Sequence, residues 1–174
     1  MKYIKITTGI LFCMLTIMAC QSQQTTEPQE PTSGGMITTG ELSGSEFSIA
    51  TGDEMDNFME MVEAFNLMDA TGIWAFSADT ITLKRADGIT AEVTVSDFEG
   101  LFSTIDSLSW DIKSVVPLQV TGTNIVRIIA DTREVMYMND GSVTRIELLE
   151  EFTFEGGILT GVRQWTAELP REGM

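Results

Sequence analysis

The chain has 174 residues, with 10 Lys and Arg residues against 26 Asp and Glu residues and a formal charge of −16 at pH 7. Such a chain is repelled by phosphate backbones and anionic head groups, which argues against a nucleic-acid partner. It has no histidine, so Ser-His triads and imidazole metal ligands are excluded, and the usual general base at neutral pH is missing.

Residues 1–19 have the pattern of a signal peptide. Lys2 and Lys5 precede an apolar run over residues 6–18, which is shorter than the roughly 20 residues that span a bilayer. The run ends in Ile-Met-Ala-Cys, at Cys20. This end resembles a bacterial lipobox, and the resemblance implies that Cys20 is acylated and becomes the mature N-terminus. An ordinary signal peptide cleaved nearby is the alternative.

The segment 20–45 is expected to be a flexible tether, because it is rich in Gln, Thr, Pro, Glu, Ser and Gly and too polar to bury a core. Removal of Lys2 and Lys5 with the signal leaves 8 − 26 = −18 charges. The only other cysteine, Cys13, lies inside the signal, so the mature chain has no disulfide partner. We therefore expect a membrane-anchored lipoprotein of the bacterial cell envelope, on its periplasmic or surface face, with one folded domain at residues 46–174.

Two helices are predicted at the start of this domain. Thr51 and Glu54 match a capping box. Apolar residues then recur at helical spacing and predict an amphipathic helix of about four turns; they are Met55, Phe58, Met59, Val62 and Phe65. A second, shorter helix or turn is predicted over residues 69–78.

A hairpin and a third helix follow. Residues 80–85 and 89–95 alternate around Asp87-Gly88, a dipeptide typical of tight hairpin turns. Ser96 and Glu99 match a second capping box, which predicts a helix of about three turns to residue 106.

The rest of the chain is predicted to form four long antiparallel strands. The first, over residues 110–120, has an apolar even face of Trp110, Ile112, Val116, Leu118 and Val120. Pro117 suits only an edge or a bulge there. The second covers residues 124–138, and the last two form a hairpin over residues 141–169 that turns at Gly156-Gly157. Helices on one face of a curved, mostly antiparallel sheet make an α+β domain.

This order of elements resembles the nuclear transport factor 2-like superfamily, which includes SnoaL-like polyketide cyclases and ketosteroid isomerases. Segments 66–69, 74–83, 96–98, 152–158 and 162–165 carry the resemblance, which covers residues 47–169. It implies a cone, in which a sheet of about six strands wraps around about three helices and encloses an apolar pocket.

The residues that the isomerases of this superfamily use are not all present. Those enzymes have an aspartate general base on the first strand, and Lys84 stands at that position here. Their oxyanion hole includes a tyrosine of the first helix, where this chain has Phe58 and Phe65.

Glu150 is the first candidate catalytic residue. It shares the even face of its strand with Ile146, Leu148, Phe152 and Phe154. If the alternation holds, its carboxylate lies in the pocket with a raised pKa, as a proton-transfer base requires. The alternative, favoured because Leu149 breaks the alternation, is a bulge that turns Glu150 to water or an ion pair with a neighbouring arginine.

Asp131 and Arg133 lie in the middle of the odd face of the preceding strand, which is apolar at both ends. As a pair they could orient a polar ligand group, with Asp131 as a second candidate base. A solvated ladder with Glu147 or Arg163 is favoured over this role. The remaining candidate ligand-binding residues are Trp74, Trp110, Tyr137 and Phe152.

The last strand has apolar residues on both faces, with Leu159, Trp165 and Leu169 opposite Ile158 and Val162. One face is free to pack against a second subunit, which predicts a homodimer through the sheet.

The sequence favours a lipid-anchored module that binds a small apolar or amphipathic ligand, or an envelope protein, without catalysis. The alternative is a cyclase- or isomerase-type enzyme with Glu150 or Asp131 as general base. No phosphate-binding loop or metal-ligand spacing occurs, so neither a cofactor nor a metal is expected.

Overall fold

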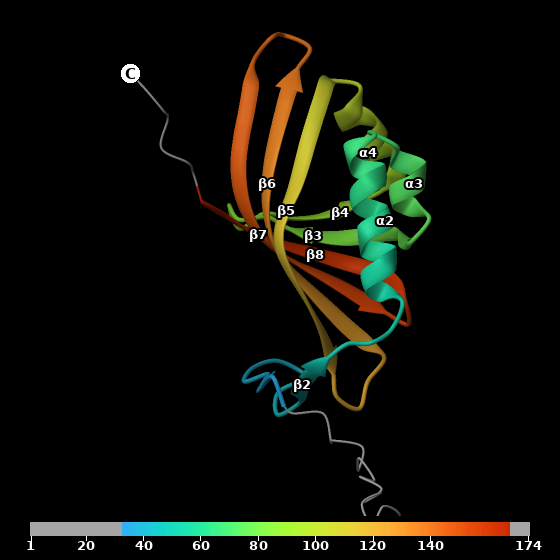
Figure 1. The fold of residues 1–174 in the computed structure, drawn as a ribbon, viewed down its shortest axis with the longest axis vertical. Helices are drawn as coiled ribbons and strands as arrows, with labels where there is room; N and C mark the ends of the chain where they lie inside the picture. The colour runs from blue at the N-terminus through green and yellow to red at the C-terminus, as the bar shows by residue number, and fades with distance from the viewer. Residues whose placement is uncertain (1–32, 168–174) are drawn as a thin grey trace, which may run out of the picture. The chain divides into compact units, whose positions relative to one another are not determined.

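The structure is a computed structural model that describes residues 33–167, with the side chains of 166 and 167 left out. The predictions for the signal peptide, Cys20, the first part of the tether and Leu169 concern residues outside this range. Within it the chain forms three helices and eight strands (Figure 1). None of these helices is both long and apolar enough to cross a membrane.

The first helix, α2 (Glu54–Asn66), forms where its apolar spacing predicts it. The capping box predicted at Thr51 is wrong, because Asp53 occupies the N-cap and its side chain makes no capping hydrogen bond. The second helix, α3 (Ala70–Trp74), ends before residue 78. Its N-cap is Asp69, whose carboxylate accepts the backbone N–H of Gly72 at 3.0 Å.

The third helix, α4 (Val95–Phe102), begins two residues earlier than predicted. Its N-cap is Thr94, and the Asp97 carboxylate accepts the backbone N–H of Thr94 at 2.8 Å. The cap predicted at Ser96 is therefore displaced by two residues. The helix also ends four residues early, because the following strand begins at Ile105.

One sheet contains all eight strands in the order β1-β2-β5-β6-β7-β8-β3-β4. Every neighbouring pair is antiparallel except β3 and β8, which run parallel. The bounds are β1 (Gly35–Met36), β2 (Glu46–Ile49), β3 (Ser77–Lys84), β4 (Thr90–Val93), β5 (Ile105–Val120), β6 (Ile125–Met138), β7 (Val143–Glu155) and β8 (Ile158–Ala167).

The predicted α+β class and curved, mostly antiparallel sheet are confirmed, but the prediction of about six strands is wrong. The two further strands are the short β1 and β2, which precede α2 and extend the sheet at the end of β5, where Phe47 lies opposite Val120. Neither strand is long enough to show an alternating pattern in the sequence.

The sheet bends so that β3, β4 and β8 cross behind the middle of the long strands, and all three helices lie on one side of it (Figure 1). The core fills the space between the helices and this inner face. Its most buried aromatic residues are Phe58 and Phe154, and the ring centroid of Phe58 lies 4.9 Å from that of Phe152. The layer arrangement therefore makes the inner face the apolar one.

Bulges in β5 and β8 change which residues face inward. The register of β5 shifts between Ile112 and Ser114, so Val115 packs against the core and Val116, predicted to be inside, is 43% exposed. In β8 the register shifts near Thr160, and Leu159 and Val162 are both buried. The prediction that these two residues lie on opposite faces is wrong, because a bulge adds one residue and reverses the alternation.

Candidate functional site

A cavity of about 100 Å³ lies between the helices and the inner face of the sheet. Helix α2, strand β3 and the long strands all contribute to its wall. Most of the lining side chains are apolar: Met61, Phe65, Ile73, Ile81, Leu83, Val93, Phe98, Trp110, Phe152, Leu159 and Val162. The polar ones are Glu134, Glu150 and Gln164. The cavity is thus an apolar chamber with carboxyl groups in its wall.

Glu150 points into this cavity and is 3% exposed. The β6–β7 register runs without a shift past this position, so Leu149 takes the outer face and is 47% exposed. The bulge that would turn Glu150 to water is absent from this strand pair, and that interpretation is wrong. Thr132 donates its hydroxyl to one carboxylate oxygen at 3.2 Å, and Gln164 donates its side-chain amide to the other at 3.0 Å.

Glu134 is a second carboxylate in the same wall, and the sequence reasoning missed it. It follows Ala130 and Thr132 on the even face of β6, and both of those are fully buried. This period of two was the signal that could have identified Glu134. It lies opposite Trp110 on β5 and opposite Ile146 on β7.

Both carboxyl groups have raised pKa values. Burial raises the pKa of Glu150, against the opposing effect of the hydrogen bonds from Gln164 and Thr132. For Glu134, burial and the neighbouring charge of Glu150 together raise the pKa from 4.5 to about 7. Two acidic groups that share an apolar site cannot both ionise freely. Glu134 therefore gains or loses its proton near neutral pH, and its titration depends on the charge of Glu150.

Trp110 fixes the aromatic part of the wall. Its backbone N–H donates to the side-chain oxygen of Asn66 at 2.7 Å, and its carbonyl accepts from the amide of Asn66 at 3.1 Å. Asn66 ends α2, so this double hydrogen bond ties the helix to the free edge of β5. The indole then packs near Phe65 and Phe152, with ring centroids 5.0 and 5.9 Å away.

The indole N–H of Trp110 is a buried donor with no hydrogen-bond partner among the described residues. It lies near enough to the Glu150 carboxylate to lower the pKa of that group. Buried donors almost always find a partner. The polar end of the cavity therefore combines two carboxyl groups with an indole N–H that lies close to Glu150.

Of the other predicted ligand-binding residues, Phe152 lines the cavity and Trp74 does not. The ring of Trp74 packs against Phe98, a lining residue, at a centroid distance of 5.2 Å, and its N–H donates to the carbonyl of Asp79 at 3.4 Å. Trp74 supports the wall from behind. Lys84, at the position of the isomerase base, is exposed at the end of β3.

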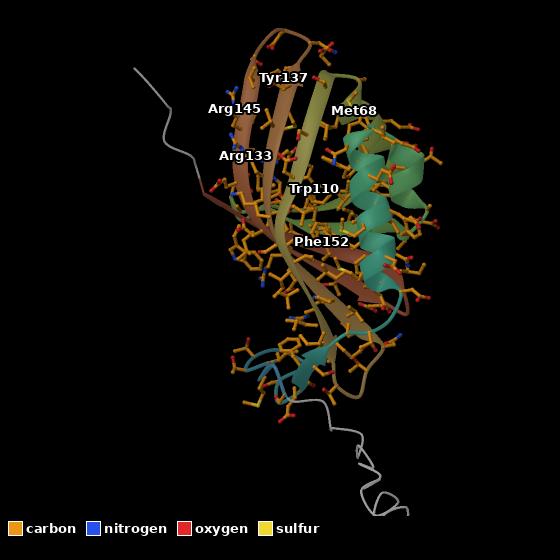
Figure 2. The ribbon with its side chains drawn as sticks, in the orientation of Figure 1. Met68, Trp110, Arg133, Tyr137, Arg145 and Phe152 are labelled. Carbon is orange, nitrogen blue, oxygen red and sulfur yellow. The ribbon has the colours of Figure 1, made fainter. Side chains whose placement is uncertain are left out.

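Asp131, Arg133 and Tyr137 do not belong to the site. They take the odd positions of β6, and the even positions face the cavity. In Figure 2, Arg133 and Arg145 lie on the side of the sheet away from the helices, whereas Trp110 lies between β5 and α2. Arg133 stands opposite Glu147 on the adjacent strand. The prediction of Asp131, Arg133 and Tyr137 as pocket residues is corrected by this alternation.

No group of three or more Cys, Asp or Glu side chains suited to a metal ion occurs in the part of the chain that the structure describes. No family model matches the sequence, and no curated protein matches it. Comparable folds are found among solved structures.

Three of these solved structures show the range of similar proteins. An NTF2-like protein of unknown function from Burkholderia pseudomallei has a TM-score of 0.50 and 13% identity, over 67% of this chain and 92% of that one. A ketosteroid isomerase-like protein from Erwinia carotovora atroseptica has a TM-score of 0.50 and 17% identity, over 66% and 94%. An LEH-like epoxide hydrolase from M. tuberculosis has a TM-score of 0.53 and 9% identity, over 66% and 83%. At such identities the likeness concerns the fold, and one fold hosts many functions.

Proposed function

We propose that this chain, which has the nuclear transport factor 2-like fold, binds a small and largely apolar molecule in the cavity of its cone. The observation that supports this function is the cavity itself, about 100 Å³ between the helices and the inner face. An apolar cavity of about 150 Å³ is known to hold one benzene molecule. The ligand is therefore of similar or smaller size, unless the helices move outward.

Fluorobenzene is a suitable probe of this function, because its fluorine resonance can be followed by NMR. We expect saturable binding to the wild-type chain and loss of binding in Val162→Phe, which fills the cavity from β8. Leu149→Phe adds the same ring on the outer face and should bind like the wild type. Absence of saturable binding to the wild type, or equal binding to Val162→Phe, would contradict the proposal.

The proposal includes an anchor. The signal-like residues 1–19 and the lipobox-like end at Cys20 support acylation of Cys20, and two or more acyl chains hold a protein stably at a membrane. The domain would then face the periplasm or the outside on a polar tether. Cys20→Ser should move the protein from the membrane fraction to the soluble fraction, and its retention with membranes would contradict the anchor.

A second candidate function is proton transfer on a small carbonyl compound. Its specific support is that Glu134 and Glu150 both line the cavity with raised pKa values, which suits an acid and a base near neutral pH. One of the similar folds belongs to a ketosteroid isomerase-like protein. Deuterium exchange into cyclopentanone, followed by NMR, tests it. Wild-type exchange above that of Glu150→Gln supports catalysis, and equal rates exclude it.

We also propose that the outer face of the sheet mediates a homodimer. Leu149 and Trp165 lie opposite each other on β7 and β8 and are 47% and 43% exposed. Val116 and Tyr137 add exposed apolar area on β5 and β6. A dimeric mass in light scattering, lost in Leu149→Asp, would support this interface. A wild-type monomer at high concentration would exclude it and leave an envelope protein as the partner.

A further inference from the structure

The carboxyl groups of the cavity have no basic residue beside them. The lining residues in the described chain include Glu134 and Glu150 but neither Lys nor Arg. Five of the seven basic residues described lie on the outer face of the long strands: Lys113, Arg127, Arg133, Arg145 and Arg163. The other two, Lys84 and Arg85, are exposed where β3 ends. Among the described residues, the charged groups that line the cavity are thus all acidic.

The two carboxyl groups differ in how the protein holds them. Glu150 accepts hydrogen bonds from Thr132 and Gln164, so its position in the wall is fixed. Glu134 makes no hydrogen bond or ion pair within residues 33–165. Its side chain is partly covered by the protein and lines the cavity. Glu134 is therefore the group whose charge a ligand would satisfy.

The remainder of the wall suits a cation with an apolar body. Four aromatic residues line the cavity, namely Phe65, Phe98, Trp110 and Phe152. Aromatic faces attract ammonium groups, most strongly where water is excluded. The indole N–H of Trp110 lies close to the Glu150 carboxylate and lowers the pKa of that group, so this donor favours the ionised form that an ammonium ion would bind.

We propose that the ligand of this cavity is a small organic amine, bound as the ammonium ion between Glu134 and Glu150 with its apolar part against the aromatic wall. This inference rests on the proposed binding function and names its ligand class. An anion would meet two acidic groups, and a neutral alcohol would leave the charge of the pair uncompensated. An amine of about five carbon atoms matches a cavity smaller than the roughly 150 Å³ that holds benzene.

Calorimetric titration of the full chain with three probes of one size tests the ligand class: isopentylamine, isopentanol and isovalerate. Detergent alone serves as the blank. We expect the amine to bind at least about tenfold more tightly than the alcohol, a difference of about 1.4 kcal/mol, and isovalerate not to bind. Equal binding of amine and alcohol overturns the inference and leaves the proposed function intact. If neither binds and fluorobenzene does not bind, the proposed function fails as well.

Two variants locate the ammonium ion. Glu134→Gln and Glu150→Gln should each weaken the amine about tenfold or more and change the affinity for isopentanol little. The matched control is Glu147→Gln, which alters a carboxylate on the outer face of the same strand as Glu150. If both cavity variants bind the amine like the wild type, the ammonium ion does not lie between these carboxylates and the inference is overturned.

Proton release gives a readout that does not depend on a variant. A cation next to Glu134 lowers the pKa of its carboxyl from about 7, so binding near pH 7, where about half of these carboxyl groups carry a proton, should release up to about half a proton from Glu134. Titrations in buffers of different ionisation enthalpy measure this number. The only titratable side chains of the described chain that line the cavity are Glu134 and Glu150, since α2, α3, α4, β3, β4 and β8 contribute apolar residues and Gln164. Tighter amine binding without proton release would contradict the proposed contact with Glu134.

Discussion

The inner and outer faces of β6 and β7 have opposite characters although their residues alternate along the same strands. Thr132 and Glu150 are buried on the inner face, and Arg133 and Leu149 next to them lie on the outer face. The inner face is apolar, and the described residues that line its cavity include two carboxyl groups but no Lys or Arg. The outer face combines basic residues with exposed apolar side chains. A step of one residue therefore decides whether a carboxylate can have a raised pKa, because only one face is covered by helices.

The largest expected contrast between the faces concerns stability. Phe152→Ala removes a ring that is 4% exposed and packs against Phe58 and Trp110, which should cost about 3–5 kcal/mol of unfolding free energy. Leu149→Ala on the outer face should cost less than about 1 kcal/mol in the monomer. Urea unfolding measures both values. Similar losses would contradict the assignment of the two faces.

The inner and outer faces should also differ in how their carboxyl groups make stability depend on pH. A carboxyl whose pKa is raised on folding binds its proton more tightly in the native state, so stability is highest at low pH and falls as pH rises through the native pKa. For Glu134 this window runs from about 4.5 to about 7. The slope is at most about −1.4 kcal/mol per pH unit for one group. Asp97 and Asp140 have lowered pKa values. Their contribution to stability is lost as pH falls, which happens below this window.

Urea titrations at pH 5, 6 and 7 should show this loss in the wild type and a smaller slope in Glu134→Gln, in which Glu150 alone of the two cavity carboxyl groups still titrates with a raised pKa. Glu147→Gln, on the outer face, should retain the wild-type slope. Identical slopes in wild type and Glu134→Gln would mean that the carboxyl of Glu134 titrates as it does in the unfolded chain.

The third contrast concerns the hydrogen bonds that hold the helices over the inner face. Asn66→Ala removes both bonds to the backbone of Trp110, and leaves two part-buried groups unsatisfied at a cost of about 1–3 kcal/mol. Asn139→Ala is the control, because its exposed side chain makes one bond to the carbonyl of Ser103. If Asn66→Ala costs no more than the control in urea unfolding, Asn66 does not fix α2 to β5.

The smallest expected effect lies at the link between α2 and α3, outside both faces. Met68 has a φ of 54°, a left-handed conformation that costs a non-glycine residue about 1 kcal/mol. Met68→Gly should therefore be neutral or stabilise the protein by up to about 1 kcal/mol, measured by thermal unfolding. A clear destabilisation would show that the Met68 side chain contributes more by packing than the backbone loses by strain.

Local patterns predicted most of the fold and part of the site. The periodicity of α2 and the turns at Gly88 and Gly156 depend on near neighbours in the chain, and these elements formed where expected. Glu150 shared its face with apolar residues in the sequence, but the single exposed Leu149 favoured a bulge that β7 does not contain. Asp131 was selected for its charge among apolar neighbours, and the register of β6 places it outside.

The sequence by itself determined the class of the fold, the acidic character of the chain and the alternating strands, because these follow from composition and from contacts along the chain. Only the tertiary structure decided which side of each strand the helices cover, since that depends on bulges in β5 and β8 and on the hydrogen bonds between Asn66 and Trp110. The tertiary structure alone also decided that Glu134 and Glu150 line the same cavity. The register places Glu134 opposite Ile146 and Glu150 opposite Ala130, and both side chains lie on the inner face of their strands.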